Sequence, residues 1–168
     1  MKIALASDHR GFKLKNILEG FLKEKGYQVI DFGTHSSSPC DYPDYVYPAC
    51  CAVKEKKVDR AIAICFTGIG SCIVANKVKG VRAALVFNLK MARLSRKHNQ
   101  SNVLVLGAGF LKIEEVKKIV MRWLKEEFEA GRHLRRIRKI KKIEEREYYT
   151  RNTTLDKSRD SVPSDETL

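Results

Sequence analysis

The sequence lacks several features that would assign it to a specialised class of protein. No stretch reaches the roughly 18 uninterrupted apolar residues of a membrane span, and the N-terminal MKIALASDHRGF meets charge too early for a signal peptide. The 5 cysteines form an odd set, with neither a CxxC pair nor cysteines and histidines at metal-ligand spacing. We therefore expect a cytoplasmic protein with no membrane partner, no disulfide framework and no metal site.

Acidic residues are scarce relative to basic ones. The chain has 33 lysines and arginines against 20 acidic residues, which gives a formal net charge of +13. Residues 132–142 (RHLRRIRKIKK) contain seven of these basic residues and no acid. Such a segment attracts phosphate groups on nucleic acid, on a membrane surface or on a small metabolite, and net charge alone does not distinguish these partners.

Short apolar segments alternate with helical patterns along most of the chain. A length of 168 residues fits one domain. We expect strands at residues 2–7, 27–32, 60–66, 81–87 and 102–107, and helices near 11–25, 42–56, 70–79, 89–98 and 112–129. Strands rich in Val, Ile and Ala that alternate with helices form right-handed crossovers. The pattern predicts a Rossmann-like three-layer αβα sandwich around a mainly parallel five-stranded sheet.

The pattern changes after Gly131. A long, highly charged helix is predicted there, with an apolar stripe too narrow to be buried within its own domain, formed by Leu134, Ile137, Ile140 and Ile143. We expect this helix to dock on a partner subunit. Residues 150–168 are polar and have too few large aliphatic side chains to offset the entropy of ordering them. We therefore predict one domain over residues 1–149 and a disordered tail over residues 150–168.

The segment CFTGIGSCIVANK (65–77) is the most informative part of the chain. Cys65 ends a predicted buried strand, and Thr67, Gly68 and Gly70 follow before a helix opens. Glycines at a strand-to-helix turn let backbone N–H groups converge on an anion, and a helix N-terminus favours an anion, including a thiolate. Alternatively, Cys65 is a small buried apolar residue and the glycines only make a tight turn. A dinucleotide fingerprint fits poorly, because Ile73 stands where the third glycine belongs.

Two pairs of polar residues accompany this turn. Asp8 and His9 follow the first strand, and His98 and Asn99 end the helix before the fifth strand. In parallel sheets the binding crevice lies beyond the carboxyl ends of the strands, and we expect both pairs to reach that edge. Acid and base groups beside a thiol suit the opening of a sugar ring and the transfer of a proton.

Five motifs occur in order over residues 1–145: ASDHRGF, DYPDY, the glycine turn ending in VANK, MARLSRKHNQSNVLVLG and GRHLRRI. In sequence and spacing they resemble ribose-5-phosphate isomerase type B. The resemblance implies an open α/β fold and interconversion of D-ribose 5-phosphate and D-ribulose 5-phosphate in the pentose phosphate pathway, with no metal or organic cofactor. It also implies a homodimer or dimer of dimers with sites shared between subunits.

The resemblance assigns catalytic roles to matching positions. Cys65 is the base that moves the proton between C2 and C1, and His98 opens the furanose ring. Thr67 and the backbone at Phe66, Gly68, Ile69 and Gly70 stabilise the enediolate. A cysteine at position 65 favours the ribose 5-phosphate branch, because the related galactose-6-phosphate isomerase subunits usually lack it.

The resemblance also assigns substrate-binding roles. Asp8 and Asn99 hold sugar hydroxyls, and Tyr42 borders the sugar. Phosphate is bound by His9, Arg132 and Arg136, with the arginines reaching across the dimer. Guanidinium groups suit phosphate, although a run of basic residues is also typical of a solvated helix face. With this small-molecule explanation of the basic segment, we expect no nucleic-acid partner.

Two positions depart from the family pattern. Phe66 stands where the family generally has glycine, and Gly109 stands where it generally has a phosphate-binding arginine. Loss of that charge-assisted contact would cost about 1.5–3 kcal/mol unless another cation, such as Lys112, replaces it. Two alternatives therefore stay open: a sugar-phosphate-binding protein of the same fold with little turnover, and an isomerase of six-carbon sugar phosphates.

Overall fold

The computed structural model describes residues 1–159 of the chain, and it describes side chains for residues 1–147. The chain divides into two units, of which the first is Met1–Ala130 and the second begins at Gly131. No helix in the described part of the chain is both long enough and apolar enough to cross a bilayer.

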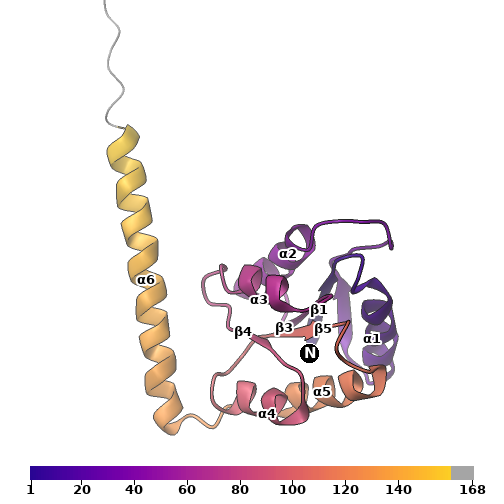
Figure 1. Cartoon of the computed structure of the whole chain (residues 1–168). Helices are drawn as coiled ribbons and strands as arrows, with labels where there is room; N and C mark the ends of the chain where they lie inside the picture. The colour runs from indigo at the N-terminus through magenta and orange to yellow at the C-terminus, as the bar shows by residue number, and fades with distance from the viewer. Residues whose placement is uncertain (160–168) are drawn as a thin grey trace, which may run out of the picture. The chain divides into compact units, whose positions relative to one another are not determined.

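Strand and helix alternate through the first unit (Figure 1). The elements are β1 (Lys2–Ser7), α1 (Phe12–Glu24), β2 (Gln28–Asp31), α2 (Pro43–Lys54), β3 (Arg60–Cys65), α3 (Ile69–Ala75), β4 (Ala83–Leu85), α4 (Leu89–Lys97), β5 (Val103–Gly107) and α5 (Ile113–Lys125). The five strands pair in the order β2-β1-β3-β5-β4, and every pair is parallel. The predicted α/β fold is confirmed.

Side chains of different size cover the two faces of the sheet. Because successive strand residues point to opposite faces, a strand buried on both sides is apolar throughout. One face packs against α1, α4 and α5 and carries the large residues Ile3, Leu5, Ile62, Ile64, Leu104 and Leu106. The other packs against α2 and α3 and carries Ala4, Ala6, Ala61, Ala63, Val103 and Val105. Figure 1 shows the resulting layers, which confirm the three-layer sandwich.

The two edge strands are shorter than the sequence predicts. β2 pairs only with β1, and β4 pairs only with β5, so each has a neighbour on one side alone. Before β4, the Arg82 N–H donates to the side-chain oxygen of Asn102 (2.7 Å). At the end of α3, the Asn76 amide donates to the Ala83 carbonyl (3.1 Å) and accepts from the Ala83 N–H (3.0 Å). Side chains of Asn102 and Asn76 thus bond backbone groups at the points where the predicted strand 81–87 and the predicted helix 70–79 would have extended further.

The helices run back toward the amino ends of the strands. Arg60, at the start of β3, donates to the carbonyls of Trp123 (3.0 Å) and Leu124 (2.9 Å) at the end of α5. Arg96, near the end of α4, donates to the Ser101 carbonyl (2.6 Å) just before β5. Burial, reinforced by repulsion from Arg60 and Arg82, lowers the pKa of Arg96 to about 10. The carboxyl-terminal ends of α4 and α5 therefore lie at the amino edge of the sheet.

The second unit contains helix α6 (Gly131–Arg159). The predicted long helix is therefore present, and Ile140 and Ile143 of its apolar stripe are exposed. Its docking on a partner subunit stays a prediction. α6 overlaps the start of the predicted tail at residues 150–168, and residues 160–168 of that tail lie outside the described residues.

The turn between β3 and α3 depends on a glycine, and this can be tested by stability measurements. Gly68 has φ of 79°, and a Cβ there would overlap Leu85 Cδ1. Gly68→Ala should lower the free energy of unfolding in urea by about 1–3 kcal/mol. Gly20→Ala is the matched control, because Gly20 is exposed inside α1 with nothing within 4 Å of a Cβ. It should raise stability by about 0.5–1 kcal/mol, and equal effects of the two changes would contradict this account.

Candidate active site

Three adjacent strands, β1, β3 and β5, end side by side. Ser7 pairs with Ile64, and Cys65 pairs with Gly107. Beyond the strands, the Asp8 N–H donates to the Ile64 carbonyl (3.3 Å), and the Ala108 N–H donates to the Cys65 carbonyl (2.9 Å). The segments that follow these strands therefore meet at one carboxyl edge, where ligands bind in open α/β sheets.

Cys65 lies at the centre of this edge. It is 4% exposed, and its Sγ accepts a hydrogen bond from the Gly68 N–H (3.2 Å). The turn that supplies this donor packs closely on β5, since a Cβ on Gly107 would lie 2.7 Å from the Thr67 carbonyl oxygen. A backbone N–H that donates to sulfur stabilises negative charge on it. The turn therefore places one backbone donor directly on the Cys65 sulfur.

The rest of the turn after Cys65 contains a hydroxyl bonded to a backbone N–H, and the ring of Tyr42 packs against it. Thr67 Oγ1 accepts from the Ile69 N–H (3.2 Å), while the Phe66 and Ile69 side chains are exposed. Tyr42 lies at the start of α2 with its ring against Gly70, where a Cβ would be 2.6 Å from Tyr42 Cζ. The structure thus brings Tyr42 to the turn, as predicted for a residue that borders a ligand.

Asp8 and His9 lie at the same edge, after β1. Asp8 is 6% exposed, and its Oδ1 accepts from the Gly11 N–H (2.8 Å). His9 Nδ1 lies 3.2 Å from both the backbone N–H and the carbonyl oxygen of Cys40, so the ring is held through Nδ1 and Nε2 is left for a ligand. Cys40 Sγ lies 4.0 Å from the same Nδ1, a contact that the sequence analysis missed and that no local motif indicates.

His98 and Asn99 lie at the opposite edge. His98 caps the end of α4, and the Asn99 carbonyl accepts from Arg82 Nε (3.1 Å) just before β4 begins. The expectation that this pair reaches the carboxyl edge of its own sheet is wrong, because a crossover helix returns to the amino edge before the next parallel strand starts. At about 3.3 Å per residue, the 6 residues of β3 separate the two edges by about 17 Å.

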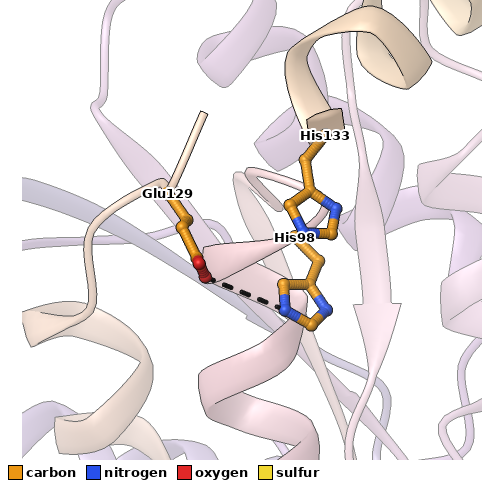
Figure 2. Close-up of side chains that lie close together, drawn as sticks. All are labelled: His98, Glu129 and His133. Carbon is orange, nitrogen blue, oxygen red and sulfur yellow. Dashed lines mark ion pairs between the residues drawn. The ribbon is translucent and has the colours of Figure 1, made fainter. Parts of the chain in front are cut away.

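A carboxylate holds the His98 ring at this edge. Glu129 Oε2 lies 3.9 Å from His98 Nε2 and 3.3 Å from Lys97 Nζ, and Figure 2 shows the His98–Glu129 pair. The Glu129 N–H also donates to the Lys97 carbonyl (3.0 Å), which fixes the loop after α5 against the end of α4. The His98 side chain is 34% exposed, so it lies beside Glu129 and is still accessible.

Arg132 and Arg136 belong to the second unit. Both are exposed on α6, and four residues apart they lie on one face of that helix. The first unit holds the thiol, the turn and both polar pairs, so the contribution of the arginines to this site stays a prediction.

The two departures from the family pattern are in contact. A Cβ on Gly109 would overlap Phe66 Cε2 and lie 2.7 Å from Phe66 Cζ. The sequence shows both changes but not that one makes room for the other, because 43 positions separate them along the chain and only the pairing of β3 with β5 brings them together.

Comparison with known proteins identifies the family and supports the fold. A family model described as ribose/galactose isomerase matches residues 3–140. Ribose-5-phosphate isomerase B of Escherichia coli K12 is 45% identical over 145 residues, which cover 86% of this chain and 97% of that protein. The Clostridium thermocellum ribose-5-phosphate isomerase B structure matches with a TM-score of 0.86 and 49% identity, covering 87% of this chain and 99% of that one.

A second solved structure is that of Mycoplasma genitalium ribose-5-phosphate isomerase B with bound ribulose-5-phosphate. It matches with a TM-score of 0.83 and 46% identity, and covers 86% of this chain and 96% of that one. The family model spans all five strands of the sheet, and the curated relative and both solved structures cover 86–87% of the chain. The resemblance seen in the sequence is confirmed, and the chain belongs to the ribose/galactose isomerase family.

Proposed function

We propose that the protein is an aldose-ketose isomerase that interconverts D-ribose 5-phosphate and D-ribulose 5-phosphate. The observation that carries the proposal is the buried Cys65 thiol, whose sulfur accepts the Gly68 N–H at the carboxyl edge of the sheet. Relatives at 45–49% identity carry the name of this activity, which supports the same substrate class. The reaction belongs to the pentose phosphate pathway.

The chemistry is a proton transfer between two neighbouring carbons. Cys65 removes the C2 proton of the open-chain aldose, and the electron pair moves into the C1–C2 bond while O1 becomes an oxyanion. The proton then returns at C1, and the hydroxyl proton passes from O2 to O1 as the C2 carbonyl forms. Electrons stay within the sugar, so no redox cofactor is required. The Thr67 hydroxyl and the backbone N–H groups of residues 66–70 stabilise the enediolate, an effect typically of several kcal/mol. The Gly68 and Ile69 N–H groups, which donate to Cys65 Sγ and Thr67 Oγ1 in the free protein, turn to the substrate when it binds.

Binding of the phosphorylated pentose uses the groups around the turn. We assign Asp8 to a sugar hydroxyl through Oδ2, because Oδ1 is taken by the Gly11 N–H. Tyr42 borders the sugar beside Gly70, and His9, held by Cys40 through Nδ1, contacts the phosphate through Nε2. Arg132 and Arg136 add charge-assisted contacts to the phosphate from a second copy of the chain.

Ring opening by His98 requires a homo-oligomer. Within one chain His98 and Asn99 lie at the amino edge, about one strand length from Cys65. We therefore assign the His98 and Asn99 of each site to a partner copy in a dimer or dimer of dimers. The apolar stripe of α6 is suited to hold such an assembly together.

A cytoplasmic location fits the state of the cysteines. All five are free, and such thiols persist where the cell keeps them reduced. Burial, reinforced by neighbouring Cys51, raises the pKa of Cys50 to about 12, so Cys50 is a core residue and not a competing nucleophile.

The role of the thiol can be tested with two cysteine variants. Cys65→Ala should lower turnover of ribose 5-phosphate, assayed with chelator present, by at least about 100-fold, because the base is lost. Cys72→Ala is the matched control, since Cys72 is half-buried on α3 and its Sγ contacts the Ala83 carbonyl (3.8 Å) and the Asn76 amide (3.5 Å), neither of which belongs to the proposed site. Unchanged turnover in Cys65→Ala would remove the thiol from its role. Native protein that binds the sugar phosphate without turnover would indicate a binding protein instead.

Sharing of the site between copies can be tested by complementation. Cys65→Ala and His98→Asn chains carrying different affinity tags should be produced together and the mixed oligomer purified through both tags. Each mixed dimer then holds one intact site of two, so its activity should be about half that of the native dimer. Activity no higher than that of either parent variant would show that His98 does not act across the interface.

A further inference from the structure

Exposed aromatic rings gather beside Cys65. Phe66 follows β3 and Phe110 follows β5, and their ring centroids lie 5.9 Å apart. Phe87, after β4, meets Phe110 edge-on at 6.2 Å. These rings are 42%, 63% and 38% exposed, respectively, so they form part of the surface at the site and not of the core. We call Phe66, Phe87 and Phe110 the aromatic cluster.

The Phe66 ring occupies the space that a side chain at position 109 would take. A Cβ on Gly109 would overlap Phe66 Cε2, and would lie 2.7 Å from Cζ and 2.9 Å from Cδ2. Phe66 and Gly109 therefore form a matched pair, in which the ring occupies the space that a side chain at 109 would need. Position 109 supplies no charge to this part of the site.

A guanidinium group lies on the same ring. Arg10 Cζ is 4.3 Å from the centroid of Phe66, within cation–π distance. Arg10 directly follows Asp8 and His9 after β1, and its side chain is exposed. Among the side chains described for residues 1–147, none places a carboxylate in an ion pair with Arg10. By contrast, the nearby Lys15 is fully buried and paired with Asp31, so it is not available to a ligand.

We propose that Arg10 binds the phosphate group of the substrate and that Phe66 is its positioning residue. A guanidinium stacked on a ring keeps its N–H donors in the plane of the fork, where they can make paired hydrogen bonds to phosphate oxygens. Phe66 limits the conformations of a long side chain, which lowers the entropy lost on binding. The inference rests on the proposed function, because it places a sugar phosphate at this edge.

The test compares three variants. Arg10→Gln should raise the KM for ribose 5-phosphate, and the Ki of inorganic phosphate as a competitive inhibitor, each by about tenfold, with kcat nearly unchanged. Lys13→Gln is the charge-matched control, because Lys13 is exposed on α1, and both constants should stay within about twofold of native. Arg10→Lys should recover only part of the affinity, since an ammonium lacks the planar fork.

The role of Phe66 gives a second, independent readout. Gly109→Ala should raise the same two constants, because its Cβ displaces the ring that holds Arg10. In a Phe66→Leu background, Arg10→Gln should cost less than in the native chain, as expected for residues that act together. Strictly additive effects would show that Phe66 does not position Arg10.

Failure of this inference and failure of the proposed function look different. Native turnover with unchanged KM and Ki in Arg10→Gln would overturn the role of Arg10 and leave the isomerase intact. If native protein shows no turnover, calorimetry with inorganic phosphate still decides: weaker binding in Arg10→Gln than in Lys13→Gln supports the phosphate site, and equal binding overturns it.

Discussion

The hydrogen bond from the Gly68 N–H to Cys65 Sγ is the contact on which the candidate site depends. It requires a strand that ends in a buried thiol and a turn that folds back at once. The left-handed conformation of Gly68 provides that turn, and Gly107 on the neighbouring strand provides the space beside it. Pairing of β3 with β5 then sets the turn beside the residues that follow β5. The positions of the Cys65 thiol, the backbone donor and the aromatic cluster all follow from the turn after β3 and its packing on β5.

The common direction of the strands places the remaining candidate groups at two opposite edges of the sheet. Asp8 and His9 follow a strand and lie beside the thiol, whereas His98 and Asn99 follow a helix and lie at the other end of the sheet. Within a single copy these two sets of candidate groups therefore cannot meet. Under the proposed function, an assembly in which the amino edge of one copy approaches the carboxyl edge of another would complete both sets at once, which is the physical reason for proposing an oligomer.

Much of the fold can be predicted from local sequence pattern. Most of the features that could not be predicted depend on contacts between segments that are far apart in the sequence. Apolar strands separated by amphipathic helices predict the parallel sheet, and the glycine turn predicts the position of Cys65. The short edge strands escape this reasoning, since the lengths of β2 and β4 depend on having a neighbour on one side only. The edge reached by His98 follows from helix direction and not from its neighbours in sequence. The contacts of Phe66 with Gly109 and Arg10 join three segments and have no local signal.

The most direct test of the central claim, a proton transfer through an enediolate, is isomerisation of ribose 5-phosphate by the native protein in deuterium oxide. Nuclear magnetic resonance then follows solvent deuterium in product and recovered substrate. We expect ribulose 5-phosphate that carries deuterium at C1 in at least part of the product. Deuterium should enter C2 of the remaining ribose 5-phosphate more slowly than it enters C1 of the product. Ribulose 5-phosphate formed with no deuterium at C1 would indicate direct hydride transfer, and the absence of product would contradict the isomerase assignment.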